Sequence, residues 1–475
     1  MKEVIVIGAG IVGSFIAHEL SKYDVHVRII EKHSDICEEV SSANSAIVHA
    51  GYDPEIGCLK GKLNILGAKA YPALCKSLHV DYQQVGALVV ACGEEEERAL
   101  EELYRRAKQR DIDVSYVGYE EIRNREPNIS KHVTKAMDVP STAIITPWEL
   151  CYALMDECLL NGCDLHLEEE VLCIDREDNR FLVQTTKKQY IGDVVINAAG
   201  LGAAKIMEMI EDETLFQITP KRGQYFILSK QAKGFVNEVL YPVPTSVGKG
   251  VLVVPTIHGN TLLGPNAEVL SEADSSTTMD GLQEIRDKLN KSVQNIPYQE
   301  VIHSYSGVRP CGNHNDFYLK NSKKYPTFIH CACIDSPGLA SAPAIGKYVL
   351  YELVMPVLEM RRKSHYIKRD AIVRMSDKSL EEKQRLIKEE PKLGHIICRC
   401  EEISEQEVVD CIHRPCGARS VKGVKKRVRP GMGKCQGGFC EIEVAKILAR
   451  ELKIPLDKVV YDADSFYESS KGEQK

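Results

Sequence analysis

The start of the chain alternates between apolar runs and a short glycine-rich segment. An apolar run, Val4 to Ile7, leads into Gly8-Ala-Gly10-Ile-Val-Gly13, which opens a helical pattern ending near Lys22. A second apolar run, Val25 to Ile30, follows and ends on Glu31. Short apolar runs on either side of a turn and a helix are typical of a βαβ unit. We therefore predict strand, tight turn, helix and strand in this order.

The spacing of the three glycines predicts a dinucleotide site. Gly8 permits the tight turn, Gly10 lets the backbone approach a pyrophosphate, and Gly13 lets the helix pack on the strand. The N-terminus of the helix then faces the phosphates. Glu31 lies 18 residues after Gly13, and we expect it to accept hydrogen bonds from ribose hydroxyls.

The middle of the chain contains short apolar runs separated by glycine and proline. One run, Val194 to Asn197, ends in Ala-Ala-Gly200-Leu-Gly202 and follows a predicted hairpin between residues 171 and 185. Other β-rich runs predict a mainly antiparallel substrate domain; they cover residues 85–90, 220–228, 251–259 and 261–264. Helical patterns over residues 59–78, 94–110 and 147–161 connect these runs. The expected fold class is α/β (α+β), with a Rossmann-like domain and an antiparallel-sheet domain.

Length and charge limit the classes of function. A chain of 475 residues is long enough for two or three domains. A net charge of −7 excludes a whole-chain role in binding nucleic acid or an anionic membrane. The uncharged stretch from Val4 to Ala17 is too short to span a membrane. Seventeen cysteines without a secretory signal predict a reducing cytoplasm, with any membrane contact peripheral or through another subunit.

Beyond Arg369 the composition changes to a charged, helical linker, Ser379 to Glu390, which ends at Pro391. Six cysteines follow, four of them as Cys398-Arg-Cys400 and Cys435-Gln-Gly-Gly-Phe-Cys440. Soft thiolates suit an iron–sulfur cluster. Zinc is the main alternative, although a one-residue gap between ligands strains a single tetrahedral ion. Residues after about Tyr467 are polar and predicted to be disordered.

The segment around these cysteines resembles the bacterioferritin-associated-ferredoxin (BFD-like) type of 2Fe-2S domain. The resemblance assigns four cluster ligands: Cys398, Cys400, Cys435 and Cys440. It leaves Cys411 and Cys416 as small buried hydrophobic residues. The segment 419–429 carries six basic residues and no acidic one. We expect these charges to compensate a negative cluster locally, with attraction of an acidic electron-transfer partner as a secondary use.

Three further motifs carry a second resemblance: Asn44-Ser-Ala-Ile-Val-His49-Ala-Gly-Tyr52, Ser306-Gly-Val-Arg309-Pro, and His258-Gly. With the loop Ile334 to Gly346, they are similar to the glycerol-3-phosphate dehydrogenase and L-2-hydroxyglutarate dehydrogenase branch of the D-amino-acid-oxidase-like superfamily. The resemblance implies FAD as cofactor. It also implies contacts between the flavin and five further residues, namely Asn44, Ser45, Gly200, Gly338 and Leu339.

The resemblance implies oxidation of sn-glycerol 3-phosphate to dihydroxyacetone phosphate. Removing the hydroxyl proton needs a base, for which His49 and His258 are candidates because histidine titrates near neutral pH. Arg309 is the first choice for the anionic group of the substrate, since a guanidinium pairs with it in bidentate fashion. Tyr52 is a weaker candidate for a substrate hydrogen bond. Lys221 and Arg222 are further cations within reach of an anionic substrate.

The electrons are expected to pass through the 2Fe-2S cluster to a partner subunit. The chain has no second glycine fingerprint for NADH, so an NAD-dependent flavoprotein or a quinone-linked membrane subunit would supply the acceptor. Three alternatives stay open: a dehydrogenase of L-2-hydroxyglutarate or another 2-hydroxy acid, an amino-acid dehydrogenase subunit, and a non-enzymatic electron-transfer subunit.

The expected domain organisation follows from these motifs. An FAD-dependent oxidoreductase occupies residues 1–370, with FAD-binding segments at about 1–80, 145–210 and 325–370. Its substrate domain covers about 81–144 and 211–324. A charged linker at 371–394 leads to a small helical 2Fe-2S domain at 395–450, and a tail fills 451–475.

Overall fold

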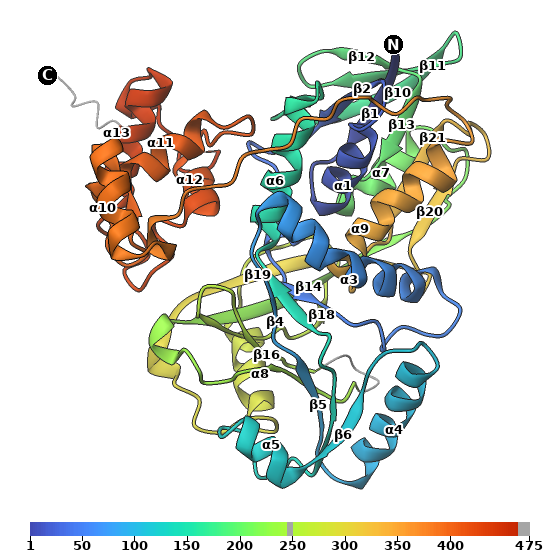
Figure 1. Cartoon of the computed structure of the whole chain (residues 1–475). Helices are drawn as coiled ribbons and strands as arrows, with labels where there is room; N and C mark the ends of the chain where they lie inside the picture. Colours follow the sequence, from blue (N-terminus) through green and yellow to red (C-terminus); the bar gives the residue numbers. More distant parts are fainter. Residues whose placement is uncertain (245–249, 464–475) are drawn as a thin grey trace, which may run out of the picture.

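The computed structural model describes residues 1–244 and 250–463. It has two lobes joined by long strands and a smaller helical module at the C-terminal end (Figure 1). The predicted disordered tail after Tyr467 lies outside the described residues. No helix within those ranges has the length and apolar character that a membrane crossing requires.

The first lobe is built on a six-stranded sheet with the order β20-β21-β13-β1-β2-β9. Five strands are parallel and β20 is antiparallel. Their bounds are β1 Lys2–Ile7, β2 Val25–Ile30, β9 Asp164–His166, β13 Val194–Asn197, β20 Tyr318–Asn321 and β21 Phe328–Ala332. This arrangement, together with the second sheet, confirms the predicted α/β class.

Both faces of this sheet are covered, which explains why its strands are apolar throughout. Successive side chains of β1 point to opposite faces. Val4 and Val6 pack among the helices, whereas Ile5 and Ile7 pack under a small three-stranded sheet. The helices are α1 Ile11–Leu20, α3 Leu59–Leu78, α6 Pro147–Leu160 and α9 Gly338–Tyr348; the small sheet is β10 Val171–Glu177, β11 Arg180–Thr185 and β12 Gln189–Gly192.

The second lobe is a nine-stranded sheet that is antiparallel apart from the β5–β15 pair. Its two longest strands, β14 (Ile218–Leu228) and β19 (Val301–Gly312), pair along their whole length and place Arg309 beside Lys221. The other strands are β5 Ala87–Ala91, β6 Ser115–Gly118, β7 Lys135–Asp138, β15 Val239–Pro242, β16 Val253–Pro255, β17 Thr261–Leu263 and β18 Glu268–Val269. Helices α4 (Glu94–Lys108), α5 (Tyr119–Arg125) and α8 (Met279–Leu289) cover it.

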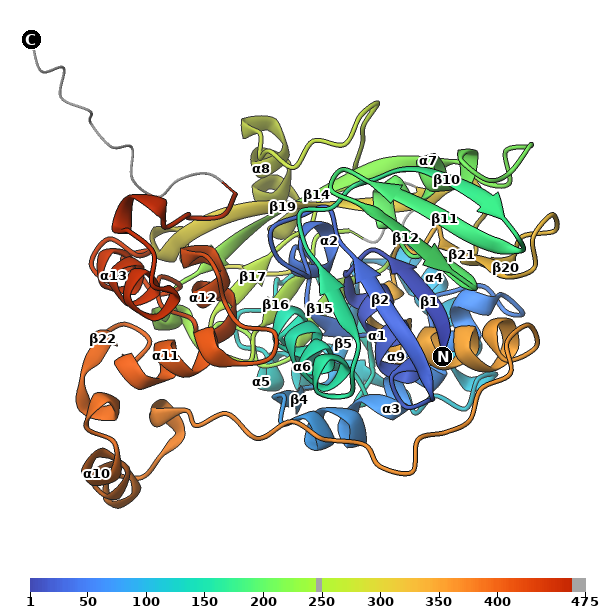
Figure 2. The same cartoon turned by 90° about the horizontal axis from the view of Figure 1, so that it is seen from above.

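An extended segment, residues 359–374, connects the first lobe to the C-terminal module (Figures 1 and 2). The predicted linker helix is present as α10 (Leu380–Glu389), and Ser379 and Glu382 form a capping box at its start. The module contains α11 (Glu405–His413), α12 (Val421–Val428), α13 (Glu441–Leu452) and the hairpin β22 (Ile396–Cys398) and β23 (Ile403–Ser404). It has an apolar core of its own between these helices.

The basic segment 419–429 lies mostly on α12, which packs against α6 of the first lobe. Arg427 pairs with Asp35, and both Lys422 and Lys426 pair with Glu38. Arg429 pairs with Glu401 inside the module. The expectation that these charges chiefly compensate the cluster is therefore corrected. Three of the six basic residues, Lys422, Lys426 and Arg427, instead hold the module against the first lobe.

Candidate functional site

A cavity of about 1250 Å³ runs between the two lobes. Five parts of the fold form its walls. These are the glycine turn after β1, the segment around α2 (Glu39–Ser42), the end of β13, the start of α9, and the strands β14 and β19. Because the carboxyl ends of the parallel strands open into it, this is where an open α/β sheet binds its ligand.

The glycine turn leaves no room for side chains. A Cβ on Gly13 would lie 2.0 Å from the carbonyl oxygen of Gly8, and one on Gly8 would lie 2.5 Å from that of Ala198. Gly8 also has φ of +103°, which disfavours other residues. Gly8 and Gly10 line the cavity, whereas Gly13 packs behind the turn. The N-terminus of α1 therefore points into the cavity, ready to bind phosphate.

Glu31 stands at the end of β2 and lines the cavity beside this turn. Its carboxylate accepts hydrogen bonds from the backbone N–H groups of Ala9 at 2.8 Å and His33 at 3.0 Å. Burial raises the pKa of Glu31, and the two backbone hydrogen bonds oppose that shift. A carboxylate has about four acceptor sites, so two remain for ribose hydroxyls.

The far end of the cavity has the features of a flavin-ring site. Its lining includes Asn44, Ser45, Gly200, Gly338 and Leu339. Gly338 is the first residue of α9, so backbone N–H groups at the start of that helix face the cavity. Such a helix terminus stabilises negative charge. The glycine turn, the ribose acceptor and this helix terminus together fit an extended dinucleotide that carries a flavin.

The four cysteines predicted as cluster ligands form two pairs. The Sγ atoms of Cys400 and Cys435 lie 3.7 Å apart, and Cys398 interacts with Cys440. A hydrogen bond from Cys440, together with backbone N–H groups, lowers the pKa of Cys398 to about 6. A thiolate is the form that binds metal. Within residues 1–244 and 250–463 no group of three His, Cys, Asp or Glu side chains is placed to hold one metal ion. Two thiol pairs suit a cluster of two irons better than one zinc ion.

Two family models match the chain. Residues 3–352 match the model of the FAD dependent oxidoreductase family, and residues 396–450 match the BFD-like [2Fe-2S] binding domain. The chain belongs to the FAD-dependent oxidoreductase family. Its cofactors are FAD and a 2Fe-2S cluster.

Two curated relatives and one solved structure are similar to this chain over most of its length. A glycerol 3-phosphate dehydrogenase from Caloramator mitchellensis is 41% identical over 470 residues, which covers 98% of each chain. A glycerol 3-phosphate oxidase from Mycoplasma genitalium is 32% identical and covers 73% of this chain and 92% of its own. The solved structure of L-alpha-glycerophosphate oxidase from Mycoplasma pneumoniae with FAD bound has a TM-score of 0.73 at 29% identity. That match covers 77% of this chain and 98% of the oxidase.

Two of the residues predicted to act on substrate line the cavity between the two lobes. His49 lines it, and its Nδ1 lies 3.0 Å from the hydroxyl of Tyr241. Arg309 lines it from β19 and donates to the carbonyl of Asn266 at 3.3 Å. In the part of the chain that the structure describes, Arg309 forms no ion pair. A half-buried guanidinium in this position is available to an anionic substrate.

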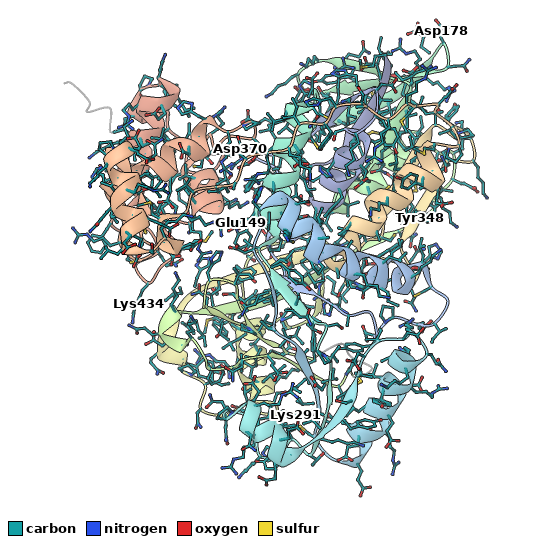
Figure 3. The ribbon with its side chains drawn as sticks, viewed as in Figure 1. Glu149, Asp178, Lys291, Tyr348, Asp370 and Lys434 are labelled. Atoms are coloured by element: carbon teal, nitrogen blue, oxygen red, sulfur yellow. The ribbon has the colours of Figure 1, made fainter. Side chains whose placement is uncertain are left out.

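The other predicted substrate residues lie elsewhere. His258 is outside the cavity lining, with its Nε2 3.4 Å from Glu149 at the start of α6 (Figure 3). Burial lowers the pKa of His258, and its hydrogen bond to Glu149 opposes the shift. Tyr52 is buried in the core of the second lobe. Arg222 is bound by Glu268 and Asp274, so its charge is already paired.

Sequence reasoning missed several residues of the cavity wall. Tyr225 on β14 lines it, and the hydroxyl of Tyr225 lies 3.2 Å from Oγ of Ser45. The ring of Tyr225 stacks on that of Tyr305, with the ring centroids 4.7 Å apart. Ser41 accepts a hydrogen bond from the N–H of Ile11 at 2.9 Å. Alternation along residues 220–228 gives a signal for Tyr225, because every second side chain of a strand shares a face. Ser41 carries no such signal.

Proposed function

We propose that this chain oxidises sn-glycerol 3-phosphate to dihydroxyacetone phosphate and passes the electrons through its 2Fe-2S cluster to a partner. The observation that carries the proposal is the 41% identity to a glycerol 3-phosphate dehydrogenase across 98% of both chains. An alignment of this extent includes both the flavin lobes and the cluster module. Arg309 lines the cavity and has no ion-pair partner among the described residues, which supports a substrate with an anionic group.

Arg309 is the proposed anchor for the phosphate. Its guanidinium presents a planar set of donors that match a phosphate in bidentate fashion. Lys221 is its direct neighbour across the β14–β19 pair but is not part of the cavity lining. Anchoring the phosphate at one end of a three-carbon substrate fixes the position of the secondary alcohol, which is the group to be oxidised.

His49 is the proposed base for the hydroxyl proton. When its Nδ1–H donates to the oxygen of Tyr241, Nε2 is the nitrogen that accepts a proton. Burial keeps the pKa of Tyr241 well above its ordinary value, so the phenol stays neutral and holds the imidazole in one orientation. FAD held by the glycine turn and Glu31 would supply the hydride acceptor for the carbon that carries the hydroxyl.

The cluster supplies the proposed exit for electrons. Cys398, Cys400, Cys435 and Cys440 are its proposed ligands, and a 2Fe-2S centre transfers one electron at a time. A partner subunit, either an NAD-dependent flavoprotein or a quinone-linked membrane subunit, is the proposed acceptor. None of the seventeen cysteines forms a disulfide, which supports a reducing, cytoplasmic location.

L-2-hydroxyglutarate is the second candidate substrate. The Escherichia coli (strain K12) L-2-hydroxyglutarate dehydrogenase is 28% identical over 272 residues, covering 56% of this chain and 64% of its own. A carboxylate pairs with Arg309 as a phosphate does. Anaerobic titration of the purified protein with each compound separates the two. Bleaching of the flavin by glycerol 3-phosphate alone supports the proposal, and bleaching by L-2-hydroxyglutarate alone overturns it.

A further inference from the structure

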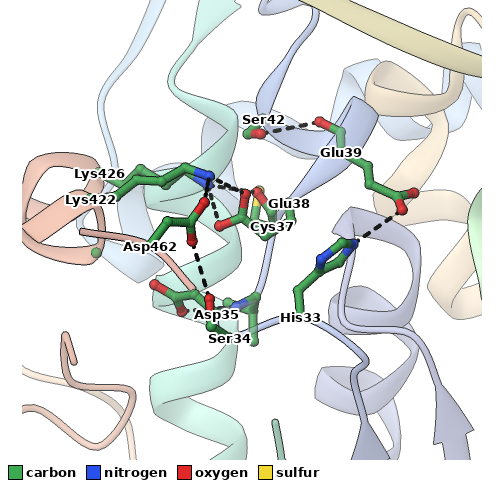
Figure 4. A network of polar contacts seen from close by, with 12 residues as sticks. His33, Ser34, Asp35, Cys37, Glu38, Glu39, Ser42, Lys422, Lys426 and Asp462 are labelled. Atoms are coloured by element: carbon green, nitrogen blue, oxygen red, sulfur yellow. Dashed lines mark hydrogen bonds and ion pairs between the residues drawn. The ribbon is translucent and has the colours of Figure 1, made fainter. Parts of the chain in front are cut away.

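The segment from Lys32 to Ser42, here called the junction loop, faces two ways. On one side its residues line the FAD cavity; these are Lys32, His33, Glu38, Glu39, Val40 and Ser41. On the other side it contacts the cluster module, because Asp35 and Glu38 bind α12 (Figure 4). One short segment is therefore shared by the cofactor site and the interface between the module and the lobe.

Arg427 makes the most buried contact of this interface. Its guanidinium donates to both oxygens of Asp35, at 2.6 and 3.0 Å, and the two side chains are 4% and 9% exposed. It also lies 3.8 Å above the ring of Tyr152 on α6. Despite burial, the charge of Arg427 lowers the pKa of Asp35, so the carboxylate stays ionised. A bidentate pair shielded from water fixes the position of the loop backbone at Asp35.

Two lysines hold the same loop at Glu38. Lys426 lies 2.6 Å and Lys422 lies 3.0 Å from the carboxylate (Figure 4). Glu38 is also part of the cavity lining. The module contributes a further contact, since Asp462 accepts a hydrogen bond from Ser34 at 3.1 Å. Three residues of the loop, Ser34, Asp35 and Glu38, therefore contact the module.

The backbone of the loop does not favour this shape by itself. Cys37 and Glu39 have φ of +56° and +51°, a region that side-chain-bearing residues rarely adopt. Such conformations persist where the surroundings impose them. The loop in turn supports the glycine turn, because the N–H of Cys37 donates to Ala9 and Ser41 accepts from Ile11. The shape of the phosphate-binding turn therefore depends on a loop that α12 holds in place.

We propose that α12 positions the FAD site, with Arg427 and Lys426 as positioning residues, so that module docking and FAD binding strengthen each other. FAD contacts one face of the junction loop and the module contacts the other, and each selects the same loop conformation. Coupling of this kind is reciprocal, because a docked module favours FAD by the same factor as bound FAD favours docking. The proposal depends on the FAD site of the family and not on the identity of the substrate.

The test uses the full-length holoprotein and measures the rate of FAD release from the rise in flavin fluorescence. Arg427→Gln and Lys426→Gln each remove a module contact with the loop while leaving the cavity lining unchanged. We expect FAD to leave about tenfold faster in either variant, within the usual range of coupling between sites. Lys434→Gln is the matched control. Lys434 joins the module to Gln231 and Glu300 of the second lobe, away from the loop (Figure 3). Its FAD release should stay within twofold.

The reciprocal measurement needs no substitution and therefore does not depend on whether a variant folds. Hydrogen exchange is followed in residues 420–429 of the native protein before and after FAD is removed. Faster exchange of α12 in the FAD-free protein is expected, with full recovery when FAD is added back. Unchanged exchange, or FAD release at the native rate in both loop-contact variants, would overturn the proposal. Neither readout involves turnover, so a wrong substrate assignment would leave both results intact.

Discussion

The hydroxyl of Tyr241 lies 3.0 Å from Nδ1 of His49, at the wall of the FAD cavity. Tyr241 is on β15 of the second lobe, whereas His49 follows the small strand β3 (Ile47–Val48). Ile47 and Ala50, on either side of His49, pack in the same core as Tyr241, so the contact is supported within the second lobe. It gives the imidazole a fixed partner on one nitrogen, which is how a general base is oriented.

Replacing His49 should remove the base. For His49→Gln we expect kcat with glycerol 3-phosphate to fall by about 10²- to 10⁴-fold, the usual contribution of general base catalysis. His258→Gln is the control, because His258 pairs with Glu149 outside the cavity, and its kcat should stay within about threefold. Steady-state rates with an artificial electron acceptor measure both. Equal losses in the two variants would contradict the assignment of the base to His49.

Arg309 should control substrate affinity. Arg309→Met removes the charge next to the cavity, and KM for glycerol 3-phosphate should rise about 10- to 100-fold, as expected for loss of a charge-assisted hydrogen bond. Arg309→Lys should recover only part of this, since an ammonium does not pair in bidentate fashion. Inhibition by inorganic phosphate offers a second measurement. A variant that retains native KM and native phosphate inhibition would exclude Arg309 as the anion site.

The cysteine pairs predict the metal content. Cys435→Ser should abolish the cluster while FAD stays bound, because Cys435 lies outside α12, the helix whose Arg427 and Lys426 contact the junction loop. Iron analysis of the native protein should give about two irons per chain and no zinc. Cys411→Ser is the matched control, since Cys411 is buried between the helices of the module and its Sγ donates to the carbonyl of Val408 at 3.2 Å. Loss of iron from the control as well would show that the module itself fails to fold.

Glu126 should make the stability of the second lobe depend on pH. It is fully buried, and burial raises its pKa to about 7 although the N–H groups of Asn237 and Glu238 donate to it. A carboxylic acid whose pKa is raised by folding stabilises the folded state while it is protonated. Its contribution to the free energy of unfolding is therefore lost as pH rises from about 4.5 to about 7. Glu126→Gln cannot ionise. Relative to the native protein, its free energy of unfolding should therefore increase by up to about 3 kcal/mol over this range.

Thermal unfolding of both proteins between pH 5 and pH 8 measures this difference. The difference between the two unfolding midpoint temperatures should increase with pH. It should become constant above about pH 8, where native Glu126 is ionised. A gap that does not change with pH would mean that Glu126 is already ionised, or still protonated, across the whole range.

Local sequence patterns predicted the parts of the fold that local physics determines. The βαβ unit could be predicted because the glycine spacing and the two apolar runs each favour one conformation. The helix Leu59–Leu78 was accessible from its periodicity. In contrast β19 was missed, because His303, Ser304 and Ser306 make it a polar strand whose partner β14 lies far away in sequence.

Side-chain pairing across the fold was not accessible from the sequence. Asp35 and Arg427 are 392 residues apart, and nothing near either residue indicates the other. The basic run of α12 therefore suggested compensation of the cluster, when its main partners are carboxylates of the first lobe. His258 likewise resembled a catalytic base in its motif, and only the tertiary structure brings Glu149 to it. The roles of the cavity residues stay predictions until the variants are measured.

The central claim is that glycerol 3-phosphate reduces the flavin and that the flavin then reduces the cluster in the same chain. Anaerobic stopped-flow absorbance of the native protein mixed with glycerol 3-phosphate tests it most directly. We predict rapid bleaching of the flavin bands followed by slower bleaching of the cluster bands, with the second phase absent in Cys435→Ser. A flavin that stays oxidised in the presence of glycerol 3-phosphate would contradict the account.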